Sequence, residues 1–350
     1  RHHHHLEVGL VQAVILVGGE GTRLRPLTLT TPKQMLPLMG VPMLEGVLGH
    51  LAAHGVDEAV LSLGYLPDRF LEAYPNGICA GVTLRYAVEP EPLDTAGAVR
   101  FAAEELGVTG TFVVVNGDVL TDLDVSALVA FHRERGAEGT IALHPVEDPS
   151  RFGVVPTDDQ GRVEAFVEKP PADEAPTNLI NAGTYVFEPS VLARIPLGER
   201  VSIERVTFPS MVTDGVLYAF ADERYWLDAG TPEAYLQAHR DILEGLRTPS
   251  YLRHEVVDGS YVDPTATVHE TAVIRGSVID ANCLVGPGAE VIDSVLLPGA
   301  RVEAAAAVRS SILGKGASVE IGAQVLGVSV LGDGAVVLPG ETVEAGRIEA

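Results

Sequence analysis

The spacing of hydrophobic residues differs between two regions of the chain, and the first region covers residues 11–245. Short apolar runs rich in β-branched residues predict buried strands, and longer patterns that end at a glycine predict helices. The predicted strands cover residues 14–17, 59–63, 82–88 and 111–115. The predicted helices cover residues 42–54, 95–106, 124–135 and 231–245. This alternation predicts an α/β domain, a mixed, largely parallel sheet with helices on both faces, whose ligands bind at the carboxyl ends of the strands.

The second region follows a linker that we predict at residues 246–260 from its Pro, Ser and Gly content. Aliphatic residues then recur every six positions, with three slips of the phase by one residue. The in-phase residues are Val256, Val262, Val268, Ile274, Ile279, Val285, Val291, Leu297, Val302, Val308, Leu313, Val319, Val325, Leu331 and Val337. A hexapeptide period predicts a left-handed parallel β-helix over residues 261–350. A chance run of Val- and Gly-rich hairpins is the alternative.

Composition excludes several classes of partner. The 350 residues carry a net charge of −24, and such a surface repels nucleic acid and anionic membranes, so we expect no nucleic acid and no membrane partner. Residues 1–10 are interpreted as a purification-tag remnant and leader. The two cysteines, Cys79 and Cys283, lie far apart and provide no disulfide framework. The simplest prediction is a cytoplasmic protein.

A glycine-rich turn, residues 18–21, follows the first predicted strand, and Arg23, Arg25 and Lys33 come soon after it. Glycines leave backbone N–H groups unshielded, and nearby cations add charge, so this pattern predicts a polyphosphate site. The turn lacks the third glycine of the dinucleotide fingerprint and the Gly-Lys-Ser/Thr of a P-loop. A glycine turn without a ligand is the alternative. Lysine is rare in the chain, yet Lys33 and Lys169 both fall inside candidate motifs.

The run Gly-x-Gly-Thr-Arg-Leu-Arg-Pro-Leu-Thr, with the Pro-Lys and Pro-Leu pairs after it, resembles the signature of the sugar-1-phosphate nucleotidyltransferases. Within them it is most similar to the guanylyltransferases that act on mannose 1-phosphate. The resemblance implies a Rossmann-like catalytic domain over residues 11–245, with a nucleoside triphosphate and a sugar 1-phosphate as substrates. The sugar phosphate oxygen would attack the α-phosphorus and expel pyrophosphate, so catalysis would rest on positioning and charge.

Two cations and the glycine turn receive roles from this resemblance and from their chemistry. Arg23 would stabilise the leaving pyrophosphate, because a guanidinium grips two phosphate oxygens and stays charged. Lys33 would bridge the triphosphate or the incoming sugar phosphate. The turn would contact the nucleotide through Gly18, Gly19, Gly21 and Thr22.

Two carboxylates lie within short sequence motifs. Asp118 follows the strand predicted at 111–115, and Asp228 precedes the last helix of the first region. Taken alone, each is a turn or capping residue. Their Asn-Gly-Asp and Trp-x-Asp-x-Gly-Thr-Pro contexts resemble the metal-binding positions of the family, which implies that they share one Mg²⁺. Asp118 is therefore expected to be catalytic as well as a metal ligand.

The resemblance also implies a sugar phosphate site. Glu168 would contact sugar hydroxyls and Lys169 the sugar phosphate, although an exposed Glu/Lys pair before a proline is the alternative. The Asn181 amide both donates and accepts, which suits a sugar hydroxyl. Gly117 and Gly183 would line the same site.

The base would be read at Glu89 and at the residues that follow, with Thr95, Ala96 and Gly97 as further nucleotide contacts. A carboxylate accepts from the two donors on one edge of guanine, whereas uracil and thymine present a single donor between acceptors. Glu89 therefore favours GTP. One position departs from the family, because Asp94 stands where a glycine is usual.

Three alternatives remain at the level of the sequence. The first is thymidylyl or uridylyl transfer to glucose 1-phosphate. The second is a regulatory subunit without activity, against which Arg23, Lys33, Asp118 and Asp228 all argue by their presence. The third is acyl transfer on the β-helix, where His269 has no basic neighbourhood. We interpret the β-helix instead as a platform for a homo-oligomer or for regulation.

Overall fold

The computed structural model describes residues 11–350, so the predicted tag remnant and leader lie outside the described residues. Packing divides the chain into two compact units that do not follow chain order. The first unit takes the described residues up to Gly19 together with Val47–Trp226, and the second takes Glu20–Gly46 together with Leu227–Ala350. The domain boundaries set above stay predictions. Among the described residues, no helix is long and apolar enough to cross a membrane.

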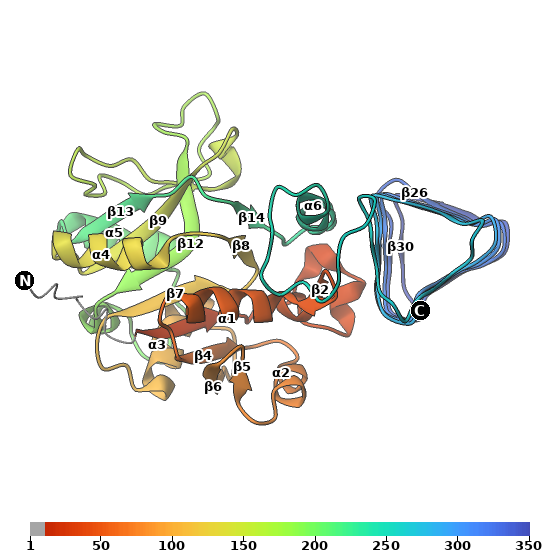
Figure 1. Ribbon diagram of the computed structural model, residues 1–350. Helices are drawn as coiled ribbons and strands as arrows, with labels where there is room; N and C mark the ends of the chain where they lie inside the picture. Colours follow the sequence, from red (N-terminus) through yellow and green to blue (C-terminus); the bar gives the residue numbers. More distant parts are fainter. Residues whose placement is uncertain (1–10) are drawn as a thin grey trace, which may run out of the picture. The chain divides into compact units, whose positions relative to one another are not determined.

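A ten-stranded mixed sheet forms the centre of the first unit (Figure 1). Its main path is β11-β10-β12-β7-β1-β4-β6-β5, with β9 paired to β12 and β13 paired to β9. The strands are β1 (Gln12–Leu16), β4 (Glu58–Leu63), β5 (Ile78–Cys79), β6 (Val82–Val88), β7 (Phe112–Asn116), β9 (Gly139–Pro145), β10 (Gly153–Val154), β11 (Val167–Glu168), β12 (Leu179–Phe187) and β13 (Leu217–Ala221). The central strands β7, β1, β4 and β6 are parallel, and β12 runs antiparallel to β7. The predicted mixed sheet is confirmed.

Helices cover both faces of this sheet, as predicted. The α-helices within residues 11–350 are α1 (Met43–Ala53), α2 (Pro67–Ala73), α3 (Asp94–Leu106), α4 (Val125–Arg135), α5 (Phe208–Thr213) and α6 (Pro232–Leu243). Val99 of α3 shares a core cluster with Ile141 of β9. On α4, His132 Nδ1 lies 2.7 Å from the hydroxyl of Thr140, which precedes Ile141. Because side chains alternate across a strand, α3 and α4 lie on opposite faces.

Capping residues explain where two of these helices begin. The Asp124 carboxylate accepts from the Ala127 N–H (3.0 Å) at the start of α4, and Gly136 ends that helix with a φ of 61°. Thr231 caps α6 in the same way by accepting from the Ala234 N–H (3.1 Å), with Pro232 as the first helical residue. Both arrangements follow from ordinary helix-end chemistry.

Three parallel sheets form the β-helix of the second unit, and its coils appear as stacked triangles in Figure 1. One sheet holds β15 (Tyr261–Val262), β18 (Val278–Ile279), β21 (Val295–Leu296), β24 (Ile312–Leu313), β27 (Val330–Leu331) and β30 (Arg347–Ile348). The next holds β16 (Thr267–Val268), β19 (Leu284–Val285), β22 (Arg301–Val302), β25 (Ser318–Val319) and β28 (Val336–Val337). The third holds β17 (Val273–Arg275), β20 (Glu290–Ile292), β23 (Ala307–Arg309), β26 (Gln324–Leu326) and β29 (Thr342–Glu344). This is the predicted β-helix architecture, whereas its use in a homo-oligomer stays a prediction.

The strand register explains the slips of the six-residue period. Tyr261 pairs with Val278 and Val278 with Val295, so one coil takes 17 residues, one fewer than three hexapeptides. Such a coil shortens one of its three repeats, whereas the coil from Ile312 to Val330 takes 18 residues and keeps all three, so no slip occurs between Leu313 and Leu331. The predicted set of in-phase residues is wrong at one position. The column of side chains that points into the β-helix contains Leu296, which pairs with Leu313, and not Leu297.

His239 of α6 predicts acid sensitivity of the second unit. The ring is 1% exposed, Nδ1–H donates to the Tyr235 carbonyl (2.9 Å), and Nε2 has no hydrogen-bond partner among the described residues. Burial lowers the pKa of His239 from 6.5 to about 4. The unfolded chain therefore binds a proton before the folded chain does, so stability present above pH 6.5 is lost as the pH falls towards 4.

The shift corresponds to about 3 kcal/mol of unfolding free energy lost across that window. We expect urea unfolding to show this loss in the wild type and a much smaller one in His239→Leu, which keeps an apolar side chain at the position. An equal acid slope in both proteins would contradict the assignment.

Candidate active site

The glycine turn after β1 lies against the ends of two other strands in the first unit. A Cβ on Gly64 would lie 2.9 Å from the Gly18 carbonyl oxygen, so the two segments approach more closely than a side chain at 64 would allow. A Cβ on Gly18 would lie 3.9 Å from Glu89 Oε1. The structure therefore brings together Gly18 and Glu89, which the sequence assigned to phosphate and base. Gly19, the next residue, is exposed.

The Glu89 carboxylate is held at both oxygens. Oε1 accepts from the Ser62 hydroxyl (3.0 Å), and Oε2 accepts from the Leu93 N–H (3.2 Å). Burial raises the pKa of Glu89, and the hydrogen bonds from Ser62 and Leu93 counteract part of that rise. A carboxylate oxygen has two lone-pair sites, so each oxygen keeps one acceptor site in a fixed direction.

Asp94 adopts the conformation that the glycine of the family would adopt without strain. Its φ is 59°, in the left-handed region that side chains rarely enter. The side chain compensates locally, because Oδ1 accepts from the Thr95 N–H (2.7 Å). The Thr95 hydroxyl accepts from the Ile203 N–H (2.8 Å) and donates to Glu204 Oε2 (3.1 Å). These contacts give Thr95 a role in joining α3 to the residues that precede α5.

The next two residues of α3 also have partners within the first unit. The N–H groups of Ala96 and Gly97 both point to the Val201 carbonyl oxygen, at 2.9 Å and 3.3 Å. A Cβ on Gly97 would lie 2.4 Å from the Glu199 carbonyl oxygen, so only glycine allows this approach. Nucleotide contacts by Thr95, Ala96 and Gly97 stay predictions, and the structure adds that these residues fasten the start of α3.

The predicted sugar residue Gly117 follows the end of β7, and Gly183 lies in the middle of β12, which pairs with β7. The Gly117 N–H donates to the Leu16 carbonyl (3.0 Å), which fixes the turn that carries Asp118. Gly183 interrupts the pairing of β12 with β9, and its φ of 80° requires glycine. A Cβ there would lie 2.8 Å from Asn116 Nδ2, so Gly183 adjoins the Asn-Gly-Asp turn.

Asn181 on β12 is bound by a buried tyrosine, and Glu168 lies on β11, two strands away in the same sheet. Asn181 Nδ2 donates to the Tyr185 hydroxyl oxygen (2.8 Å), and Oδ1 accepts from the Gly183 N–H (2.9 Å). Burial and the charges of Glu204 and Glu168 raise the pKa of Tyr185. Lys169 follows Glu168 with a φ of 45°, and both are exposed at the edge strand β11. The predicted sugar residues thus share one region of the first unit.

The second unit carries the cationic part of the signature. Thr22–Leu24 forms a short 3₁₀-helix that contains the exposed Arg23 and begins after Gly21, whose φ is 64°. The Thr28 hydroxyl donates to the Gly21 carbonyl (2.6 Å). A Cβ on Gly21 would lie 2.9 Å from Thr28 Cγ2 and 3.3 Å from Lys33 Cβ. The structure therefore brings Gly21, Arg23 and Lys33 into one compact segment.

Asp118 belongs to the first unit and Asp228 to the second. Both are half-buried, and Asp228 Oδ1 accepts from the Gly230 N–H (3.0 Å), which orients its carboxylate. Among residues 11–350, no cluster of three or more His, Cys, Asp or Glu side chains is arranged to hold a metal. Mg²⁺ often takes only one or two carboxylates and fills its remaining positions with water and phosphate oxygens, so each of these carboxylates has the chemistry that it prefers.

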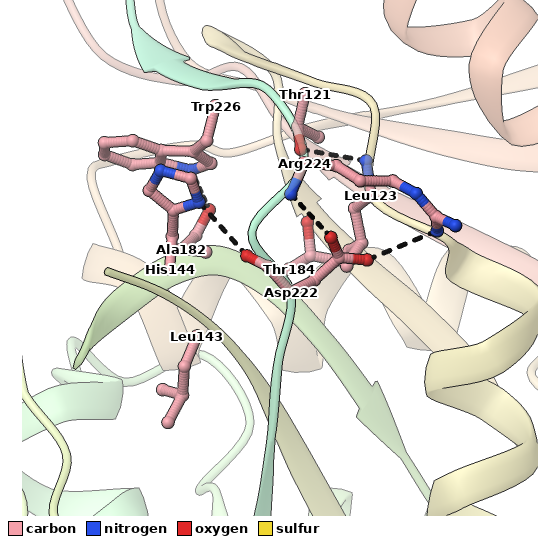
Figure 2. Close-up of a pocket in the computed structure, with 9 residues that line it drawn as sticks. All are labelled: Thr121, Leu123, Leu143, His144, Ala182, Thr184, Asp222, Arg224 and Trp226. Carbon is pink, nitrogen blue, oxygen red and sulfur yellow. Dashed lines mark hydrogen bonds and ion pairs between the residues drawn. The ribbon is translucent and has the colours of Figure 1, made fainter. Parts of the chain in front are cut away.

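A small pocket in the first unit is lined by nine residues, among them His144, Ala182 and Trp226 (Figure 2). Trp226 Nε1–H donates to the Ala182 carbonyl (2.8 Å), and its ring stacks on His144 with centroids 5.5 Å apart. Asp222 Oδ2 lies 3.5 Å from Arg224. None of the predicted site residues lines the pocket, and Trp226 packs in its wall.

Sequence reasoning missed the residues that hold the predicted ones in place. Ser62 orients Glu89, Glu204 binds Thr95, and Thr28 closes the loop at Gly21. Only Thr28 carried a signal, because it lies inside the signature run. Ser62 and Glu204 act across the fold, and no local pattern marks them.

Family models match two parts of the chain. Residues 12–245 match the family described as Nucleotidyl transferase, and residues 256–348 match the GMPPB C-terminal domain. A protein of Mycobacterium tuberculosis named mannose-1-phosphate guanylyltransferase is 43% identical over 73% of this chain and 72% of its own length. A mannose-1-phosphate guanyltransferase of Schizosaccharomyces pombe is 41% identical over 74% and 73%.

The chain is also similar to a solved structure. HddC from Yersinia pseudotuberculosis, in a crystal structure described as complexed with GMP-PN, superposes with a TM-score of 0.57 at 30% identity. The match covers 66% of this chain and 99% of that one. A family model over more than half of the chain and relatives above 40% identity point the same way as the signature. The chain therefore belongs to the nucleotidyl transferase family, as an enzyme of its sugar-1-phosphate nucleotidyltransferase branch.

Proposed function

We propose that this enzyme transfers GMP from GTP to mannose 1-phosphate in a Mg²⁺-dependent reaction that yields GDP-mannose and pyrophosphate. The phosphate oxygen of the sugar forms a bond to the α-phosphorus of GTP. The bond from that phosphorus to the oxygen bridging to the β-phosphate breaks, and pyrophosphate leaves with the electron pair. No side chain forms a covalent bond, so the protein contributes position and charge.

The observation that carries the choice of GTP is the geometry of Glu89. Ser62 and Leu93 hold its two oxygens beside the glycine turn, and each oxygen keeps one acceptor site. Guanine offers two adjacent donors, N1–H and the 2-amino group, which pair with two parallel acceptors. Uracil and thymine would place carbonyl oxygens against the carboxylate.

The remaining residues act on phosphates and sugar. Arg23 binds the departing pyrophosphate, and Lys33 neutralises the triphosphate or the sugar phosphate. Asp118 and Asp228 would hold Mg²⁺, which when bound would neutralise the triphosphate and stabilise the charge developing on the α-phosphoryl group. Glu168, Lys169 and Asn181 would bind the sugar phosphate, together with Gly117 and Gly183.

The reverse reaction tests this proposal without any assumption about binding order. GDP-mannose, pyrophosphate and Mg²⁺ are expected to give GTP and mannose 1-phosphate, whereas UDP-glucose gives no UTP. Formation of UTP at a comparable rate would discard the assignment of the base. Absence of both products from folded protein that binds GDP-mannose would favour a regulatory subunit.

The raised pKa of Glu89 predicts a pH dependence of GTP binding. The carboxylate is the form present above the pKa, and protonation removes an acceptor that guanine needs. We expect the KM for GTP to stay level at high pH and to rise as the pH falls, with the rise beginning at a higher pH than for an exposed glutamate.

Glu89→Gln provides the matched control, since its amide does not titrate. The variant should show a KM for GTP about 10–100-fold higher at neutral pH, because a hydrogen bond to a charged group is lost. Its KM for GTP should no longer rise over the pH range in which Glu89 becomes protonated. A variant that kept the wild-type KM for GTP would contradict the base-reading role.

A further inference from the structure

The segment that carries Arg23 and Lys33 packs against the β-helix within the second unit. Glu20–Gly46 and Leu227–Ala350 form one compact unit, although long stretches of sequence separate them. A Cβ on Gly332 would lie 3.1 Å from Pro26 Cβ and Cγ, so the coil backbone touches the signature directly. The Tyr235 hydroxyl of α6 donates to the Pro37 carbonyl of the same segment.

One polar contact fixes this packing. The Thr30 hydroxyl donates to Asp333 Oδ2 (2.7 Å), and the other oxygen, Oδ1, accepts from the Lys315 N–H (2.9 Å). The carboxylate is thereby anchored to the neighbouring coil, and it presents its second oxygen to the signature segment. The Gly334 N–H donates to the Lys315 carbonyl (2.8 Å), which fixes the same corner of the coil.

The coils that precede this one have no acidic residue at the position of Asp333. The Gly316 N–H donates to Pro298 and the Gly299 N–H to Ala281, in the way that the Gly334 N–H donates to Lys315. The positions that correspond to Asp333 in the preceding coils are therefore Lys315, Pro298 and Ala281. Stacking of the β-helix does not require a carboxylate at this corner, so its presence opposite Thr30 calls for another explanation.

A short series of contacts connects Thr30 to the cations. The Thr30 hydroxyl also lies 3.3 Å from the Leu27 carbonyl oxygen, in the 3₁₀-helix Leu27–Leu29. Thr28 of that helix donates to the Gly21 carbonyl, directly before Arg23, and Gly21 packs against Lys33 Cβ. A shift of Thr30 would therefore be transmitted to both cations through one rigid turn.

We propose that Asp333 is a positioning residue, which through Thr30 holds Arg23 and Lys33 at the geometry of the transition state. The β-helix is then part of the catalytic apparatus and not only a platform for assembly. The inference rests on the proposed roles of Arg23 and Lys33. Small displacements of groups that act by position and charge reduce turnover strongly while binding changes less.

The test is a double-mutant cycle on Thr30→Val and Asp333→Ala, measured as kcat and KM for GTP and for the sugar phosphate. Each single variant is expected to lower kcat about 5–30-fold with a change in KM below about threefold. The double variant should be no slower than the slower single variant, because one contact is lost in all three. Asp333→Asn keeps an acceptor for the Lys315 N–H and a polar partner for Thr30, and should recover most of the loss.

The matched control is Asp293→Ala, another half-buried acid at a β-helix turn, whose N–H donates to Arg275 within the β-helix. It is expected to keep the wild-type kcat. Thermal unfolding separates a folding defect from a positioning defect, and Thr30→Val carries the test if Asp333→Ala fails to fold.

Two results would overturn the inference. Wild-type kcat in folded Thr30→Val would show that the contact does not position the cations. A loss of kcat in the double variant equal to the product of the two single losses would show that Thr30 and Asp333 act independently. Arg23→Ala distinguishes this failure from failure of the proposed function. Full turnover in Arg23→Ala would reject the role of the segment itself, whereas its loss beside an active Thr30→Val would reject only the role of Asp333.

Discussion

Arg23→Ala is expected to lower kcat for pyrophosphate release by about 10³-fold, the effect of removing an arginine that stabilises a phosphoryl-transfer transition state. Arg23 is exposed on the turn that follows Gly21, in the segment shared with Lys33. The KM for GTP should change much less, because the charge on pyrophosphate develops as the bond to the α-phosphorus breaks.

Arg23→Lys separates charge from geometry. A lysine keeps the charge but cannot bind two phosphate oxygens in one plane, so it should recover only part of the loss. Arg69→Ala is a matched control on α2, where the guanidinium lies 3.5 Å from Glu72 on the surface. Equal kcat values for Arg23→Ala and Arg69→Ala would contradict the role of Arg23.

Asp118→Asn is expected to reduce kcat by about 10³-fold at moderate Mg²⁺, because a metal contributes several kcal/mol of charge stabilisation to such reactions. The Gly117 N–H bond to the Leu16 carbonyl fixes the turn that carries Asp118, so the isosteric change from carboxylate to amide is expected to leave the backbone intact. Asp228→Asn should act similarly. Titration with Mg²⁺ should show half-maximal activity at a higher concentration in both variants.

Asp158→Asn serves as the control for a carboxylate in a turn. Asp158 Oδ1 accepts from the Gln160 and Arg162 N–H groups, both at 2.9 Å, in an exposed loop. It should leave both kcat and the Mg²⁺ requirement unchanged. An unchanged Mg²⁺ titration in Asp118→Asn would show that this carboxylate does not bind the metal.

Local signals in the sequence were sufficient for the elements with strong patterns. The strand Val82–Val88 begins and ends where the apolar run does, and Asp124 caps α4 as its residue type predicts. The β-helix followed from its period alone. The misplaced slip at Leu297 arose because Leu296 and Leu297 are both apolar and both buried, so that hydrophobicity could not decide between them.

Contacts between distant segments were beyond the reach of pattern reasoning. The strand Leu179–Phe187 has no continuous apolar run, since the glycine at 183 interrupts it and its pairing with β9. Ser62 and Leu93 hold Glu89 from two different segments. The packing of Glu20–Gly46 in the unit of the β-helix includes the contact between Thr30 and Asp333, which lie 303 positions apart, and no periodicity relates them.

The most direct test of the proposed reaction is pyrophosphate release with Mg²⁺, measured for GTP, dTTP, UTP, ATP and CTP against the 1-phosphates of mannose, glucose and glucosamine. We expect release to be confined to GTP with mannose 1-phosphate, and GDP-mannose to be the second product. Turnover with dTTP or UTP that equals or exceeds turnover with GTP would contradict the base assignment at Glu89. No release from any pair, in folded protein that binds GDP-mannose, would contradict the proposed activity itself.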